Sequence, residues 1–180
     1  MRLPALALLL LLPWLPPPLH AEVKQAAPDH MLVENSRVLH VSPARAYAAL
    51  PHVARWWSGT HTWSGDAANL SLDAVAGGCF CERWGKSSVQ HMRVLQASQD
   101  KLLRLEGAIG PLQEMAVDGV MTFALAPDAH GTRLTFQYRV NGASASALDQ
   151  LAPAVDHVLM EQLGRFQRYV ETGTVGAAKP

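Results

Sequence analysis

The chain has 180 residues, of which 49% are hydrophobic, with 15 basic and 15 acidic side chains. This length is typical of a single domain with one sizeable core. The balanced charge excludes a strongly basic surface for nucleic acid and a polybasic patch for anionic lipid.

The first 21 residues differ from the rest and are typical of a secretory signal peptide. Arg2 supplies a positive charge, an apolar stretch runs from Leu3 to Leu12, and Leu19-His20-Ala21 places a cleavage position before Glu22. The stretch is too short and too interrupted by Pro for a transmembrane helix, which needs about 20 apolar residues. We expect an exported protein, periplasmic or secreted, with no membrane span after cleavage; an uncleaved membrane anchor is the alternative.

The rest of the chain divides into three expected parts: a flexible polar lead-in at residues 22–31, a folded domain at residues 32–173 and a loose tail at residues 174–180. The domain begins with a predicted strand at residues 33–41. Ser42 suits a helix N-cap and Pro43 suits the first helical turn. Two short helices are therefore predicted, at residues 44–50 and 52–58.

Six strand-length stretches follow, at residues 70–75, 79–84, 89–97, 101–106, 119–125 and 132–140. Several alternate between apolar and polar residues, so that Met121 and Phe123 share one face of their strand and Phe136 and Tyr138 share one face of theirs. Short stretches of Gly, Pro and Asp separate the strands. This succession predicts an antiparallel sheet rather than strands alternating with helices.

The last predicted element is a long amphipathic helix. Its apolar residues recur at intervals of three and four, which places them on one face: Leu148, Ala152, Val155, Leu159, Leu163, Phe166 and Val170. Pro153 predicts a break between a short first piece and a longer second piece. Gly173 suits the C-terminal end of the helix.

The order of these elements, and several local motifs, resemble the START-like (SRPBCC) family with its helix-grip fold. The motifs are Ser42 to Leu50, Gly77-Gly78 before an aromatic residue and Glu82, Gly131-Thr132-Arg133-Leu134-Thr135, and Val155 to Leu163. The bacterial proteins called activator-of-Hsp90-ATPase-like or polyketide-cyclase-like are the most similar subgroup. The resemblance implies an α+β fold, in which a curved antiparallel sheet wraps around the C-terminal helix and a ligand cavity lies between them.

Aromatic and apolar residues supply most of the candidate ligand-binding positions. Trp57, Trp63 and Trp84 fall in one short part of the chain and fit either an aromatic cavity wall or core packing. The sheet faces that carry Met121, Phe123, Phe136 and Tyr138 are the expected partners of the helix and of the ligand.

Glu82 and His91 are the polar candidates for this cavity. If Glu82 lies among aromatic residues, burial would raise its pKa and suit it to acid–base catalysis. The favoured alternative is a surface carboxylate paired with Arg83, Arg93 or Arg104, because charged residues are mostly exposed.

Cys79 and Cys81 lie two residues apart on a predicted strand. Their Cα atoms would be about 6.5–7 Å apart there, at the long limit for a disulfide, so a bridge would be strained and reducible, and two small buried residues are the favoured interpretation. A redox role in an oxidising compartment is the alternative. A zinc site would need His91 and the distant His61 as further ligands. We therefore expect no metal, and in the absence of a nucleotide-binding motif we expect no cofactor.

Three functions remain open on these grounds. The first is an exported binding protein for a small hydrophobic molecule. The second is an enzyme of the cyclase or hydratase kind that uses Glu82 or His91 as acid or base. The third is a protein-interaction domain with a filled core. A cavity of several hundred Å³ separates the first two from the third.

Overall fold

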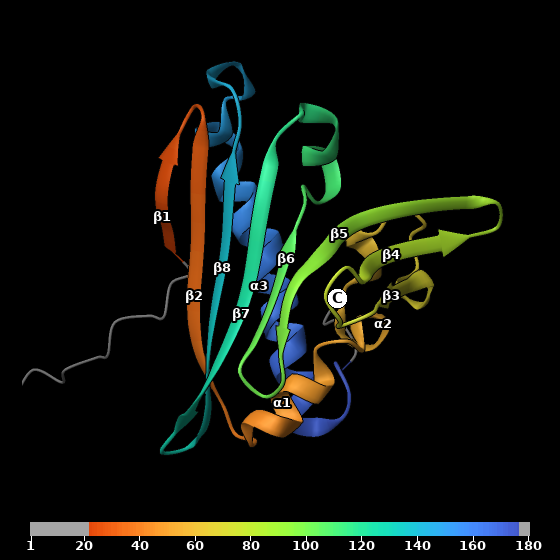
Figure 1. Cartoon of the computed structure of the whole chain (residues 1–180), viewed down its shortest axis with the longest axis vertical. Helices are drawn as coiled ribbons and strands as arrows, with labels where there is room; N and C mark the ends of the chain where they lie inside the picture. Colours follow the sequence, from red (N-terminus) through yellow and green to blue (C-terminus); the bar gives the residue numbers. More distant parts are fainter. Residues whose placement is uncertain (1–21, 177–180) are drawn as a thin grey trace, which may run out of the picture.

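The structure, a computed structural model, describes residues 22–176 and has the α+β helix-grip fold. A curved antiparallel sheet has the strand order β1-β2-β8-β7-β6-β5-β4-β3, and the long helix α3 lies along one of its faces (Figure 1). The strands are β1 (Glu22–Ala27), β2 (His30–Leu39), β3 (Leu70–Leu72), β4 (Cys79–Trp84), β5 (Ser87–Ser98), β6 (Leu102–Glu106), β7 (Asp118–Asp128) and β8 (Gly131–Asn141).

The helices confirm the predicted arrangement of two short helices and one long one. The α-helices are α1 (Pro43–Ala49), α2 (Val53–Trp56) and α3 (Leu148–Thr172), and the 3-10 turns are η1 (Gly59–His61), η2 (Ala67–Asn69), η3 (Gly110–Met115) and η4 (Ser144–Ser146). Ser42 caps α1 by accepting a hydrogen bond from the Arg45 N–H. Within residues 22–176, no helix is both long and apolar enough to cross a membrane.

Residues 22–27 form the edge strand β1, which corrects the expected flexible lead-in at residues 22–31. They pair antiparallel with β2 through a turn at Pro28-Asp29, from Glu22 opposite Glu34 to Ala27 opposite His30. An edge strand is exposed along one side, so it needs few apolar residues. The polar composition of β1 therefore gave no strand signal in the sequence.

Helix α3 runs unbroken from Leu148 to Thr172, which corrects the expected break at Pro153. Pro153 lies in the second turn, where the ring removes only the hydrogen bond to the Asp149 carbonyl. Buried residues on both sides of it, Leu148 and Ala152 before and Leu159 after, share one face. Packing of that face holds the helix together across the missing bond.

The hydrophobic core is densest where β7 and β8 pair over their whole length. Phe123 and Phe136 lie directly opposite each other, with ring centroids 5.1 Å apart. At the other end of the core, Phe166 of α3 packs edge-on against Trp56, with centroids 5.2 Å apart. This part of the molecule has a filled interior.

Strand β5 has two bulges that change its direction. Phe80 pairs with Met92 and Cys81 pairs with Gln90, so His91 is an extra residue in the ladder. Leu95 is extra in the same way against β6. Bulges bend a strand and increase its twist. The β4–β5 hairpin accordingly projects sideways from the rest of the sheet, away from α3 (Figure 1).

Candidate functional site

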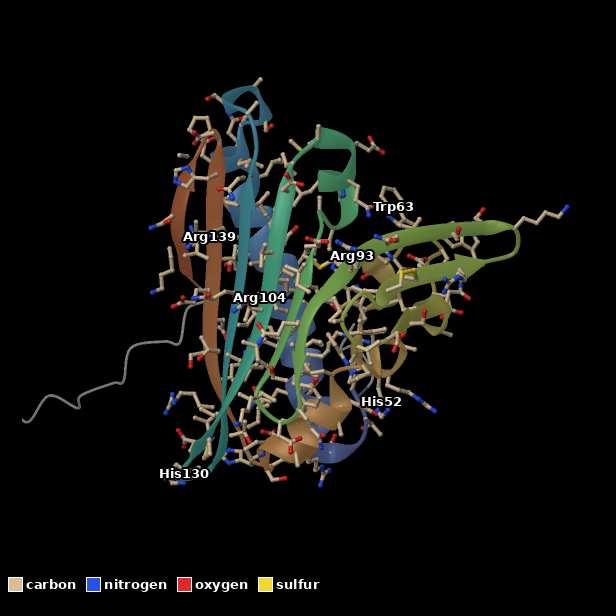
Figure 2. All side chains as sticks on the ribbon, viewed as in Figure 1. His52, Trp63, Arg93, Arg104, His130 and Arg139 are labelled. Carbon is tan, nitrogen blue, oxygen red and sulfur yellow. A yellow bond between two sulfur atoms is a disulfide. The ribbon has the colours of Figure 1, made fainter. Side chains whose placement is uncertain are left out.

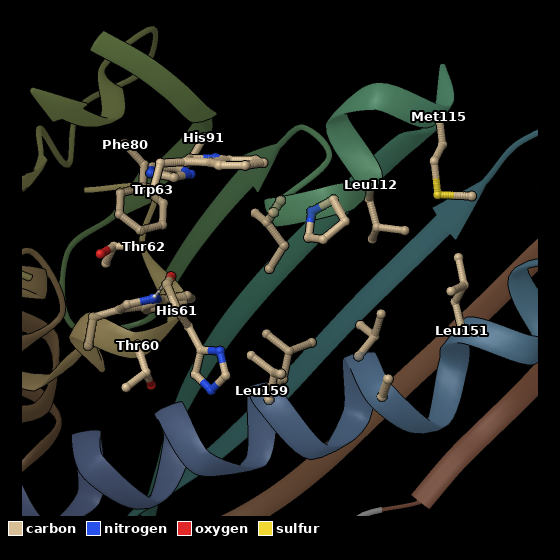
Figure 3. Close-up of a pocket in the computed structure, with 17 residues that line it drawn as sticks. Thr60, His61, Thr62, Trp63, Phe80, His91, Leu112, Met115, Leu151 and Leu159 are labelled. Atoms are coloured by element: carbon tan, nitrogen blue, oxygen red, sulfur yellow. Dashed lines mark hydrogen bonds between the residues drawn. The ribbon is translucent and has the colours of Figure 1, made fainter. Parts of the chain in front are cut away.

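A cavity of about 420 Å³ lies between the first half of α3, the base of the β4–β5 hairpin, the segment 57–63 and the η3 turn (Figure 3). Its lining residues are Trp57, Thr60, His61, Thr62, Trp63, Phe80, His91, Ile109, Gly110, Pro111, Leu112, Met115, Leu151, Ala154, Val155, Val158 and Leu159. The volume is in the range of small-molecule pockets.

Aromatic and aliphatic side chains make up most of the cavity wall. Trp57 and Phe80 meet edge-to-face with ring centroids 5.5 Å apart. Trp63 lines the cavity and is still 45% exposed, which places its indole at the rim. A molecule bound here would be held mainly by removal of apolar surface from water.

The segment 57–63 is fixed to α3 by hydrogen bonds. The Ser58 N–H donates to Oε1 of Gln162 at 2.7 Å, and the Arg165 guanidinium donates to the carbonyls of Trp56 and Trp57. His61 adds a contact between its Nε2 and Oε2 of Glu161 at 3.0 Å. These bonds make one wall of the cavity a preformed surface.

The opposite wall, η3, is held by the Tyr138 hydroxyl. This group donates to the Gly107 carbonyl at 3.1 Å and accepts from the Ile109 N–H at 3.3 Å. Burial raises the pKa of Tyr138, so the hydroxyl stays protonated and can donate. Gly119 is required beside it, because a Cβ there would lie 2.7 Å from the hydroxyl oxygen.

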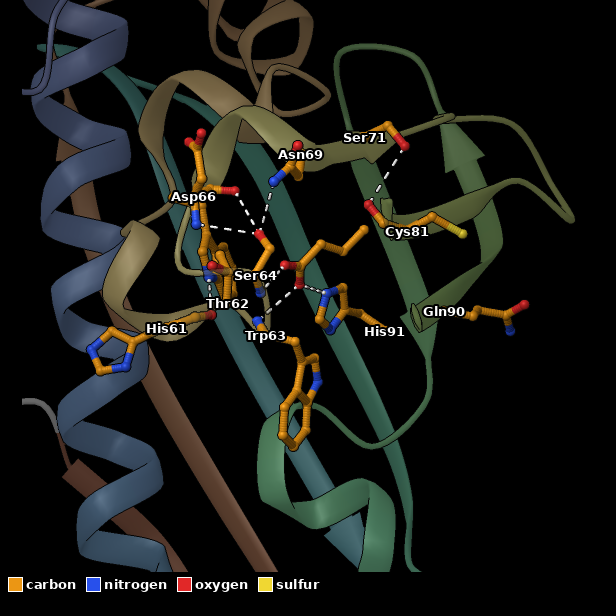
Figure 4. A network of polar contacts seen from close by, with 12 residues as sticks. His61, Thr62, Trp63, Ser64, Asp66, Asn69, Ser71, Cys81, Gln90 and His91 are labelled. Carbon is orange, nitrogen blue, oxygen red and sulfur yellow. Dashed lines mark hydrogen bonds and ion pairs between the residues drawn. The ribbon is translucent and has the colours of Figure 1, made fainter. Parts of the chain in front are cut away.

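Glu82 is fully buried and joins the segment 57–64 to the hairpin. Figure 4 shows the polar network around Trp63, Ser64 and His91. Its Oε1 accepts from the Ser64 N–H at 2.6 Å, and its Oε2 accepts from the Trp63 N–H and from His91 Nε2, each at 3.0 Å. Burial alone would raise the pKa of Glu82, but the hydrogen bonds outweigh burial and hold it below its usual value. The carboxylate is therefore ionised and satisfied.

This environment corrects both sequence-based expectations for Glu82. The carboxylate is not at the surface with Arg83, Arg93 or Arg104; Arg93 instead pairs with Glu106 on the outer face. Nor is its pKa raised, because hydrogen bonds from Ser64, Trp63 and His91 stabilise the charged form. Glu82 positions its neighbours and does not line the cavity.

His91 lines the cavity and is 7% exposed. Burial lowers the pKa of His91, partly offset by the neighbouring Glu82 carboxylate, which raises it. The ring also lies 5.1 Å from that of Phe80. Its place as the extra residue of a bulge explains why it and the next residue, Met92, are both buried.

Cys79 and Cys81 form a disulfide, which corrects the expectation of two small buried thiols. Their Cα atoms are 5.4 Å apart, which is closer than in a fully extended strand and within the usual range for a disulfide. Among residues 22–176, no group of three or more His, Cys, Asp or Glu side chains is placed to hold a metal ion.

The structure brings together only part of the set predicted from the sequence. Trp57, Trp63 and His91 line the cavity, and Glu82 lies directly behind His91. Trp84 is half-buried on the hairpin and does not reach the cavity. The expected lining residues of β7 and β8 are buried in the filled core instead: Met121, Phe123, Phe136 and Tyr138.

Sequence reasoning missed two sets of lining residues. Ile109, Leu112 and Met115 lie in or next to η3, and Leu151 and Val158 lie beside the main apolar face of α3. The signal for the first set is a group of large apolar residues in a loop. The signal for the second is an apolar face wider than one stripe.

No protein-family model and no curated protein sequence matches the chain. Solved structures do match in fold. An Aha1 dimer from Colwellia psychrerythraea is 16% identical, with a TM-score of 0.58, over 79% of this chain and 97% of that one. An uncharacterised protein from Rhizobium leguminosarum is 19% identical, with a TM-score of 0.58, over 79% and 95%.

A third similar structure is DynU16, a protein of the dynemicin biosynthetic locus. It is 17% identical, with a TM-score of 0.56, over 79% of this chain and 48% of the other. At these identities the likeness concerns the fold alone. The chain shares the helix-grip fold with these proteins.

Proposed function

We propose that this protein is exported and binds one small hydrophobic molecule in the cavity between α3 and the β4–β5 hairpin. The observation that carries the proposal is the cavity itself, about 420 Å³ in volume and lined mostly by apolar side chains. The resemblance of the sequence to the START-like family points the same way.

Export is supported by two independent features. Residues 1–21, which lie outside the described residues, have the pattern of a signal peptide. The Cys79–Cys81 disulfide is typical of an oxidising compartment. Cleavage before Glu22 would leave every described strand and helix intact, because β1 begins at that residue. N-terminal sequencing of periplasmic material should start at or near Glu22.

The binding function is tested by mass spectrometry of small molecules that co-purify with the exported protein. Val158→Trp places an indole in the cavity and should abolish co-purification. His157→Trp is the matched control, because His157 is the adjacent residue of α3, is exposed and does not line the cavity. Equal ligand content in both variants would contradict binding at this site.

A second candidate function is acid–base catalysis on the bound molecule. The observation that favours it is the Glu82–His91 pair, which presents an oriented imidazole to the cavity. If the protein is an enzyme, the wild type should release the product of the reaction, whereas the His91→Phe variant should retain the unconverted substrate. A binding protein should yield molecules of the same mass from both.

A further inference from the structure

The two ring nitrogens of His91 have different roles. Nε2 lies 3.0 Å from Oε2 of Glu82. The same carboxylate also accepts from two backbone N–H groups, so it is ionised and acts only as an acceptor. Nε2 must therefore carry the proton and donate it to Glu82.

Nδ1 is the nitrogen that is left for a ligand. It makes no hydrogen bond with any residue of the described chain. The only fully buried side-chain N or O atoms without a partner in that part of the chain are Oδ1 of Asp149 and Oδ1 of Asp156. Nδ1 is thus in contact with open space, which for His91 is the cavity that its ring lines.

Nδ1 is an acceptor at neutral pH. Burial holds the pKa of His91 below its usual value of 6.5, so the ring is neutral. A neutral ring with the proton on Nε2 has a lone pair on Nδ1. An N–H at Nδ1 would also have no acceptor among the described residues.

The other polar side chains of the cavity are either engaged within the protein or, like the Trp63 indole N–H, lie at the rim. No Lys or Arg is among the lining residues, and the Glu82 charge lies directly behind His91, so a ligand carboxylate would be repelled. The Thr62 hydroxyl already donates to the Gly59 carbonyl, and the Thr60 hydroxyl shares a hydrogen bond with that of Ser58. His61 contacts Glu161 through its own Nε2.

We propose that the cavity selects hydrophobic molecules that carry a hydroxyl group, an alcohol or a phenol, which donates its hydrogen bond to Nδ1 of His91. Glu82 is the positioning residue that fixes the proton on Nε2 and so makes Nδ1 an acceptor. This inference rests on the proposed binding function and adds the chemical class of the ligand.

The test compares three probes with the same biphenyl body, titrated calorimetrically into the mature protein at pH 7.5. They are 4-phenylphenol, which donates, 4-methoxybiphenyl, which only accepts, and biphenyl-4-carboxylate, which is charged. One hydrogen bond predicts that the phenol binds about tenfold more tightly than the ether. The carboxylate should bind most weakly.

Two variants assign the effect to one ring. His91→Phe should reduce the ratio of phenol to ether affinity to about one, because the acceptor is lost. His61→Phe replaces the other histidine of the cavity and should change both affinities together, leaving the ratio intact. Should His91→Phe fail to fold, ¹⁵N NMR of the wild-type imidazole gives the same answer, because the phenol must shift the Nδ1 resonance and the ether must not.

The outcomes separate the two proposals. Equal affinities for phenol and ether, or tighter binding of the carboxylate, would overturn the selection for a hydroxyl while leaving a binding protein. Persistence of the tenfold ratio in His91→Phe would also overturn it. No binding of any probe would overturn the binding function, and the hydroxyl selection with it.

Discussion

The two halves of the sheet differ in how closely they pack against helix α3. Around β7 and β8, large side chains such as Phe123 and Phe136 are buried and pack against each other in the core. Around β4 and the first half of β5, the sheet bends away from α3, and a cavity of about 420 Å³ lies between them. We call this part of the sheet the hollow half. The side chains of the hollow half are no smaller, since Trp57, Trp63 and Phe80 all line it.

Backbone direction, and not side-chain size, therefore makes the cavity. The bulges at His91 and Leu95 bend β5 outward, and the segment 57–63, with η1, and the η3 turn line the gap from the sides. The lining is held in place by polar anchors, Glu82 on one side and Tyr138 on the other. In the view of all side chains, Trp63 lies between the η3 turn and β5 (Figure 2).

The largest effect should come from removing a side chain in the filled half. Phe123→Ala leaves a void among buried neighbours and should lower the free energy of unfolding by about 3–5 kcal/mol. Val158→Ala enlarges a space that already exists and should cost about 1 kcal/mol or less. Urea denaturation of both variants measures the difference. A cost for Val158→Ala near that of Phe123→Ala would contradict the contrast.

The regular elements of the fold could be predicted from the sequence, whereas the bulges of β5 could not. Alternation in β7 and β8 and the spacing along α3 predicted these elements, because a strand or helix with one buried face repeats its pattern. A bulge inserts one residue and shifts the pattern, so His91 and Met92 are both buried where alternation allows only one. No local signal marks the insertion, since it depends on the register of the partner strand.

The same reasoning explains the candidate site. The aromatic residues near η1 were identifiable as a cluster, and Trp57 and Trp63 do line the cavity. Met121 and Tyr138 were expected in the lining but lie in the core around β7 and β8, because the bend that opens this cavity lies at the β4–β5 end of the sheet. The buried Glu82 could not be found either, since its partners are backbone N–H groups that no residue type reveals.

The second prediction concerns the anchor of the hollow half. Glu82→Ala leaves the N–H groups of Trp63 and Ser64 and the His91 ring without their acceptor, and should cost about 3 kcal/mol. Glu106→Ala is the control, because its ion pair with Arg93 lies on the outer face and contributes about 0–1 kcal/mol. Chemical denaturation measures both. Equal costs would show that Glu82 is not the anchor.

The third prediction concerns the opposite wall. Tyr138→Phe keeps the buried ring and removes only the hydroxyl that holds Gly107 and Ile109, so it should cost about 1–2 kcal/mol. Because η3 is a cavity wall, backbone hydrogen exchange should increase at residues 109–115 more than in β8. A uniform increase over the whole chain would mean that the hydroxyl supports the core rather than the wall.

The smallest effect is the pH dependence of stability, which should come from the hollow half. His91 is the first group to respond, because burial lowers its pKa below 6.5 in the folded protein. Below pH 6.5 the His91 imidazole is protonated in the unfolded chain but stays neutral in the folded protein. The free energy of unfolding therefore falls as the pH drops towards the pKa of His91 in the folded protein. Glu82, whose pKa is held below 4.5, adds a second loss as pH falls below 4.5.

Variants separate the two steps. Glu82 of β4 contacts His91 directly, and His61, which contacts Glu161 of α3, lines the same cavity. His91→Phe should remove the loss that begins below pH 6.5 and keep the one below pH 4.5, whereas His61→Phe should keep the His91 step. Thermal denaturation from pH 8 to pH 3.5 follows both. A gain in stability between pH 6.5 and 5 that is lost in His91→Phe would mean that His91 is charged in the folded state, and its Nδ1 would then be a donor rather than an acceptor.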